Sequence, residues 1–230
     1  MVNSLGIRAM RFSLFLIPSA TAFLAALYPV MAQVPDSYSG TPYGGKAQTI
    51  PGRVELAWFD AGGEGVAYHD TEAANQGAEY NHRPEQQILG AGATDAVKFF
   101  RPDEGVDISF TKSGLDFTDE NLVMPEVNQH YIGWQADGEW TNYTVDVKVP
   151  GKYRIVALYG NADNGSEIWL NGSLATPLVL PIDTGNWHHW NKAVVGELEL
   201  PKAGLNLLTL YYNEGANLAY LDFILITPNQ

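Results

Sequence analysis

The chain has 230 residues, with 13 Lys and Arg against 26 Asp and Glu, and a formal charge of −13. This excess of acid argues against a nucleic-acid-binding surface, an anionic membrane surface and a polyanionic substrate, all of which need clustered Lys and Arg. A hydrophobic fraction of 46% argues against a disordered acidic chain, and the absence of Cys removes disulfides and thiolate chemistry.

The first segment, residues 1–32, has the pattern of a signal peptide. Arg8 and Arg11 precede an apolar stretch over residues 12–31, which ends in small residues at Ala32. We therefore expect cleavage after Ala32 and a secreted protein, extracellular or periplasmic, with no stable membrane insertion. The alternative is an uncleaved anchor, because the apolar stretch is long enough to span a membrane.

The rest of the chain divides into a short leader and one domain. Residues 33–49 are rich in Gln, Ser, Gly, Pro and Thr and lack apolar periodicity, which predicts a flexible leader. Residues 50–230 then form a single folded domain, which is long enough for a sizeable core.

The second half of this domain alternates apolar and polar residues with a period of two. Strands are predicted over residues 141–149, 153–159, 166–170, 194–200, 205–212 and 219–226. Turn dipeptides such as Pro150-Gly151 and Asn171-Gly172 separate them, and no stretch longer than 12 residues carries a convincing helical face. This pattern predicts an all-β fold, an antiparallel β-sandwich or jelly roll.

Two segments depart from this rhythm. Residues 83–101 and 112–129 are long and weakly patterned, which predicts loops that are either functional or variable. The Trp residues within or beside strand patterns are expected in the core: Trp58, Trp134, Trp140, Trp169 and Trp190.

Catalytic and metal-binding patterns are weak. A glycosidase needs two carboxylates across a cleft. The candidates, none in a spacing that demands the role, are Glu64, Asp70, Glu79, Asp137 and Glu139. No Gly-x-Ser-x-Gly motif is present, and the adjacent His188 and His189 would point to opposite faces of a strand, so they cannot share one metal there.

The aromatic and amide residues point to a sugar site. A sugar ring presents a flat C–H face and a rim of hydroxyls, so its site combines an aromatic plane with polar side chains. Trp187 follows Gly185 and Asn186 in a turn, where it need not be core, and Asn213 and Asn217 flank the last hairpin.

Several segments resemble, in order along the chain, the family 6 carbohydrate-binding modules. They are IPGRVE at 50–55, DAGGEGVAYHDT at 60–71, NQG at 75–77, EGVDI at 104–108, IGW at 132–134, GEWTNYTV at 138–145, TGNWHHW at 184–190 and NLAYLDF at 217–223. Each motif alone is weak, but together they cover most of residues 50–227.

The resemblance implies a non-catalytic jelly roll that binds a polysaccharide or oligosaccharide among loops at one end of the sandwich. In that family a Tyr and a Trp hold the sugar ring and an Asn bonds a hydroxyl, and Trp187 and Asn217 match that Trp and Asn. The Tyr position falls on Tyr80 or on Phe100, with Tyr80 preferred. About 20 extra residues lie between the two positions, and this insertion, at residues 83–101, can reshape the cleft.

The resemblance also implies a structural calcium ion bound by two Glu of the first strand and an Asp of the last. Glu55 and Asp222 match two of these ligands, whereas Ala57 stands where the second Glu is expected. The loss of one carboxylate predicts a weakened site and a modest stabilisation by calcium.

Two other functions stay open. One is a glycoside hydrolase or lyase whose carboxylates are not assigned, and it requires two acids flanking the cleft. The other is a structural or adhesive surface protein, for which Trp187 would be buried.

Overall fold

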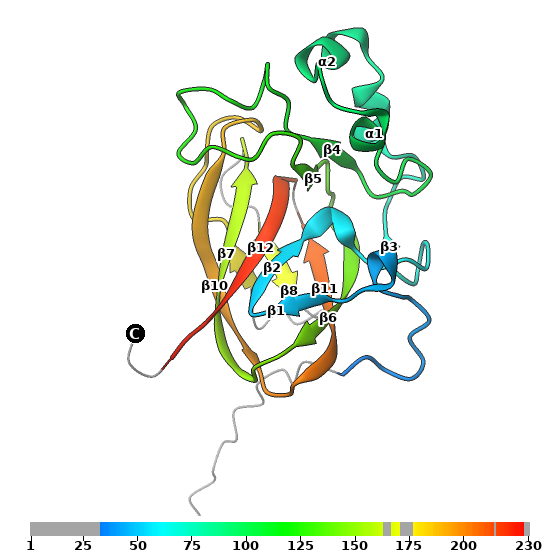
Figure 1. The fold of residues 1–230 in the computed structure, drawn as a ribbon, viewed down its shortest axis with the longest axis vertical. Coiled ribbons are helices and arrows are strands. Elements are labelled where there is room, and N and C mark those ends of the chain that lie inside the picture. The colour runs from blue at the N-terminus through cyan, green and yellow to red at the C-terminus, as the bar shows by residue number, and fades with distance from the viewer. Residues whose placement is uncertain (1–32, 163–166, 171–176, 214, 228–230) are drawn as a thin grey trace, which may run out of the picture.

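Two facing β-sheets form the molecule, as Figure 1 shows. This computed structural model describes residues 33–162, 167–170, 177–213 and 215–227. Within them, one six-stranded sheet has the order β1-β6-β11-β8-β9 with β3 paired to β6. The other has the order β10-β7-β12-β5-β4 with β2 paired to β12. The prediction of an all-β sandwich is confirmed.

The strands are β1 (Gln48–Ile50), β2 (Gly52–Glu55), β3 (Tyr68–His69), β4 (Ile108–Phe110), β5 (His130–Ile132), β6 (Trp140–Val147), β7 (Gly151–Gly160), β8 (Glu167–Leu170), β9 (Pro177–Val179), β10 (Asn191–Leu200), β11 (Gly204–Tyr212) and β12 (Asn217–Leu225). The helices are the 3-10 turns η1 (Tyr43–Gly45) and η2 (Leu56–Trp58) and the α-helices α1 (Gln76–Asn81), α2 (Pro84–Leu89) and α3 (Asp95–Lys98). All six strands predicted from the alternating pattern are present, as β6, β7, β8, β10, β11 and β12.

Part of the expected leader belongs to the sandwich. β1 starts at Gln48 and pairs in parallel with β6, the one pair of this kind in the described sheets, and Thr41 bridges to Ala61. The prediction of a flexible segment over residues 33–49 therefore needs correction. Its polar composition hides a short strand that is held by backbone pairing with β6, by the Gln48 side chain bonded to the Glu55 backbone, and by the buried Ile50.

The weakly patterned segment before β4 contains helices rather than a plain loop. Asn75 caps α1 by accepting from the Ala78 amide, and Pro84 starts α2. Gly77 allows α1 to lie against β4, because a Cβ there would stand 2.2 Å from the Ile108 carbonyl oxygen. In Figure 1, α1 and α2 lie at one end of the sandwich, beyond β4.

The main core lies between the two sheets. The Trp residues differ in burial. Trp190 is fully buried, as predicted, in a second apolar cluster with Tyr131, Leu158, Ala219 and Tyr220. Trp58 and Trp134 are 44% and 39% exposed, and Trp140 is half-buried, so the core prediction was wrong for these three. Two of them lie outside the strands, since η2 holds Trp58 and β5 ends at Ile132 before Trp134.

The side chain of Trp169 and the predicted signal peptide over residues 1–32 lie outside the described residues. Among the residues that are described, no helix has the length and apolar character needed to cross a membrane.

Candidate functional site

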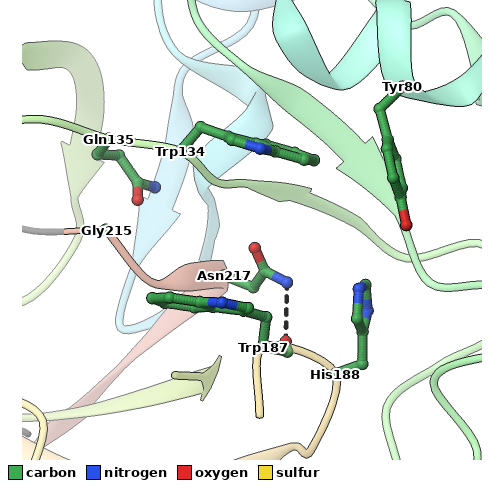
Figure 2. A pocket seen from close by; sticks show the side chains of 7 residues that line it. All are labelled: Tyr80, Trp134, Gln135, Trp187, His188, Gly215 and Asn217. Atoms are coloured by element: carbon green, nitrogen blue, oxygen red, sulfur yellow. Dashed lines mark hydrogen bonds between the residues drawn. The ribbon is translucent and has the colours of Figure 1, made fainter. Parts of the chain in front are cut away.

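A pocket of about 470 Å³ opens among the loops at the end of the sandwich where β5 stops and β12 starts. Its described lining residues are Tyr80, Trp134, Gln135, Trp187, His188, Gly215 and Asn217. Figure 2 shows Trp134 and Trp187 on opposite sides of the pocket, with Tyr80 at one end and Gln135 at the other. We call the space between the two indoles the Trp134–Trp187 slot.

Trp187 lies in the loop before β10 and is 36% exposed, as the turn position predicts. Asn217 fixes this loop, because its Nδ2 donates to the Trp187 carbonyl oxygen at 2.8 Å. The Asn217 Oδ1 lies close to Gly133, where a Cβ would stand 2.6 Å from it. Gly133 thus lets the β5 end approach the start of β12, which brings Trp134 and Asn217 to the same pocket.

Trp134 lines the pocket, although its sequence pattern predicted a place in the core. Its φ of 56° places it in the left-handed region, which is rare for a bulky residue and turns its ring outward. The sequence signal was available, because Gly133-Trp134 is followed by Gln135-Ala136-Asp137-Gly138, a turn composition rather than a strand.

Gln135 was also missed, and it carries an unused hydrogen-bond donor. The residue is 8% exposed and its Oε1 accepts from the Ala216 amide at 3.0 Å. Its Nε2 is buried and has no partner among the described residues. A buried donor without an acceptor is costly, so an acceptor supplied by a ligand in the pocket would be favourable.

Of the two aromatic residues proposed to face Trp187, the structure brings only Tyr80 to the pocket. Tyr80 lies on α1, with its ring centroid 5.6 Å from that of Trp134. Burial raises the pKa of Tyr80, so its hydroxyl stays neutral and able to donate. Phe100, which follows α3 along the chain, instead stacks on His130 with 4.3 Å between the ring centroids and does not line this pocket.

His188 also lines the pocket, and its side chain is bonded to the buried carboxylate of Asp116. Its Nδ1 lies 2.8 Å from the Asp116 Oδ1, and the Asp116 side chain is fully buried. Asp116 also accepts from the Trp190 Nε1 at 2.9 Å and from the Lys112 amide at 2.7 Å. These bonds fix the imidazole, so that its other nitrogen is free to contact a ligand.

The residues expected to bind calcium are engaged by cations of the protein itself. Lys192 Nζ lies 2.6 Å from Asp222 Oδ2, and Arg53 Nε lies 3.5 Å from Asp222 Oδ1. Arg53 also pairs with Glu55 at 3.6 Å, while the other Glu55 oxygen accepts from Gln129. The hydrogen bond to Asp222 raises the pKa of Lys192, which keeps that amine charged.

As placed, Glu55 and Asp222 therefore do not fit a calcium site. Ala57 is buried and offers no carboxylate, and within the described parts of the chain no three His, Cys, Asp or Glu side chains cluster so as to hold a metal ion. The calcium ion that the resemblance implies is thus a prediction for a thermal melt to decide.

We expect thermal melts in calcium and in chelator to coincide, which revises the modest stabilisation expected from the sequence. Lys192 and Arg53 already neutralise Asp222, so a divalent cation would have to displace them before it gained ligands. The measurement is the Tm of the purified protein in each buffer. A higher Tm in calcium would mean that the ion displaces the two side chains and that the family site is retained.

A second group of acids surrounds a much smaller cavity of about 10 Å³, lined by Asp70, Asp107 and Glu139 among others. Burial, reinforced by the neighbouring carboxylates, raises the pKa of Asp70 to about 6 and that of Asp107 to about 8. Perturbed acids in a cleft are a signature of catalysis. The space holds about one water molecule, however, and not a sugar ring.

The raised pKa of Asp107 predicts a pH-dependent stability. Between its unfolded value near 4 and its folded value of about 8, the folded state binds more protons, so stability falls as the pH rises through this window. Asp107→Asn keeps an oxygen for the Gln76 amide and should flatten this decline. The test is Tm against pH from 4 to 9, with the exposed Asp103→Asn as control. If the curves of Tm against pH for Asp107→Asn and wild type run parallel, Asp107 is not the source of the pH dependence.

Sequence comparison places the chain in a known family. The family model described as carbohydrate binding module (family 6) matches residues 108–228, which is more than half of the chain. The chain belongs to carbohydrate-binding module family 6. The match includes Trp134, Trp187 and Asn217, whereas Tyr80 lies before it. A search among curated proteins finds no significant match.

Solved structures similar in fold include three such modules. A module from Clostridium stercorarium in complex with cellobiose is 11% identical, with 79% of this chain and 99% of that chain covered and a TM-score of 0.46. A module from Cellvibrio mixtus lichenase 5A in complex with cellotriose is 21% identical, with 43% and 79% covered and a TM-score of 0.37. A β-1,3-glucan-binding module from Bacillus halodurans is 21% identical, with 41% and 76% covered and a TM-score of 0.35.

Proposed function

We propose that this family 6 module binds a carbohydrate by taking one pyranose ring into the Trp134–Trp187 slot. The observation that carries the proposal is the pair of exposed indoles on opposite sides of one pocket (Figure 2). Two aromatic planes can cover both faces of a sugar ring, whose C–H groups are apolar, and leave its hydroxyl rim to polar side chains.

The polar groups around the slot suit that rim. The unpartnered Gln135 Nε2 can donate, the Asn217 Oδ1 can accept, and the Tyr80 hydroxyl can do either. Amides and a neutral phenol favour hydroxyl groups over a charged ligand. His188, held by Asp116, adds one further nitrogen to this set.

We further propose that the slot binds without cleaving. Hydrolysis of a glycosidic bond needs two carboxylates about 5–9.5 Å apart. The described residues that line the slot offer none, and the oxygens of the nearby Asp116 are already bonded within the protein. The exposure of Trp187 argues against the purely structural alternative, for which that side chain would be core.

Export is part of the same proposal, because polysaccharides that such a module would bind lie outside the cell. Arg8 and Arg11 before the apolar stretch, with small residues up to Ala32, support cleavage. N-terminal sequencing of exported protein should start at Gln33. An intact Met1 on membrane-bound protein would contradict both cleavage and release.

The proposal as a whole is tested by retention on a panel of soluble polysaccharides in affinity electrophoresis. The wild type should be slowed by at least one glucan, xylan or galactan, and free oligosaccharide of that glycan should reverse the effect. Unchanged mobility in every polysaccharide would contradict carbohydrate binding by this chain.

A further inference from the structure

We propose a second carbohydrate-binding site around Tyr43 and Trp58, separate from the slot. This second proposal rests on the proposed function in one respect, which is that the ligand is a carbohydrate. A second pocket of about 470 Å³ lies here. Its described lining residues are Tyr43, Gly44, Lys46, Ala47, Gln48, Thr49, Arg53, Glu55 and Trp58.

Trp58 is held rigidly but faces outward. It ends η2, in which Leu56 and Ala57 are buried, so the backbone of this turn is anchored in the core. Nevertheless 44% of the Trp58 surface stays exposed. An exposed aromatic side chain that a second aromatic residue extends into a patch marks a ligand-binding surface, and Tyr43 supplies that second ring.

Tyr43 lies beside Trp58 and extends the aromatic surface. The two ring centroids are 6.1 Å apart, with 30° between the ring planes. Phe100 also contacts Tyr43, with 5.4 Å between the ring centroids, which gives a role to an aromatic residue that the slot does not use.

Arg101 connects both aromatic residues to the core. Its guanidinium lies 5.1 Å from the Tyr43 ring and donates to the carbonyl oxygens of Phe59 and Asp60, which follow Trp58. The Arg101 side chain is 5% exposed. The platform is therefore preorganised, and binding would not have to order it.

Polar groups surround this platform in the way a sugar rim requires. The Gln48 side chain bonds the Glu55 backbone and donates to the Trp58 carbonyl oxygen at 3.3 Å. These bonds hold η2, and with it Trp58, against β1. Lys46 and Arg53 can donate to hydroxyl oxygens, and Glu55 can accept from hydroxyl groups. One aromatic platform between donors and acceptors is suited to one face of a pyranose ring.

This second site is independent of the first. The two pockets share no described lining residue. All nine lining residues of the second pocket precede residue 59, whereas the family match starts at residue 108. Tyr43, Lys46 and Gln48 come from the segment that the composition had predicted to be flexible.

A platform that covers one face of the ring should bind a short oligosaccharide more weakly than a slot that covers both. On a long polysaccharide, the two sites act together, because binding at one raises the effective concentration of sugar at the other. We therefore expect the second site to affect polymer retention much more than oligosaccharide affinity.

The test is affinity electrophoresis in a polysaccharide that retains the wild type. The double variant Trp134→Ala/Trp187→Ala should keep weak retention, and adding Trp58→Ala should abolish it. Trp58→Ala alone should lower the apparent affinity for the polymer about tenfold, whereas Val194→Ala, which truncates a similarly exposed apolar side chain on β10, should not. Thermal melts confirm that each variant is folded.

Complete loss of retention in the slot double variant would overturn the second site and leave the proposed function intact. Residual retention that survives the added Trp58→Ala would also overturn it, because the remaining binding would lie elsewhere. A wild type that no polysaccharide retains would contradict both the proposed function and the second site.

Discussion

Trp187→Ala is expected to weaken oligosaccharide binding about 30-fold without unfolding the protein. Removal of a central aromatic anchor typically costs about 2 kcal/mol of binding free energy, and roughly 1.4 kcal/mol corresponds to a factor of ten. Trp134→Ala should have an effect of similar size, because its indole covers the opposite side of the slot. Both residues are exposed and lie outside the core, so the melting temperature should change little.

Calorimetric titration of each variant with an oligosaccharide that the wild type binds gives this comparison. Ile224→Ala, which truncates an exposed apolar side chain on β12, is the matched control and should bind normally. Wild-type affinity in both Trp variants would mean that the slot is not the sugar site.

Trp190→Ala should have the opposite profile, with a loss of about 3–5 kcal/mol in the free energy of unfolding. Trp190 is fully buried, packs edge-on against Tyr131 at 5.4 Å and donates its Nε1 to Asp116. The substitution leaves a large cavity and removes one bond from the buried carboxylate that also holds His188.

Urea denaturation measures this loss, and Trp187→Ala three positions away is the control that should unfold like wild type. Trp190→Phe separates the two causes, since it keeps most of the volume but loses the bond to Asp116. A Trp190→Ala protein as stable as wild type would contradict its assignment to the core.

The strand pattern was predictable because a half-buried sheet imposes a period of two on the sequence. β6, for example, alternates Tyr143, Val145 and Val147 toward the core, and its boundaries follow from the turn dipeptide after it. The same reasoning failed for β1, whose place depends on parallel backbone pairing with β6 and not on any side-chain periodicity of its own.

The site was predictable only in part. Trp187 stood out because it follows a Gly-Asn turn, and Asn217 because it starts the last strand. Trp134 and Gln135 did not stand out, since their exposure depends on a left-handed backbone at residue 134 and on a contact with Ala216, 81 residues away in sequence. Long-range contacts also decide that Arg53 and Lys192 neutralise Asp222, one of the two acids expected to bind calcium.

The most direct measurement of the central claim is an experimental structure of the protein with an oligosaccharide from a polysaccharide that retains it. The proposed function predicts one pyranose ring between the Trp134 and Trp187 indoles, with a hydroxyl oxygen within hydrogen-bond distance of the Gln135 Nε2. An oligosaccharide bound elsewhere on the molecule, with the Trp134–Trp187 slot empty, would contradict it.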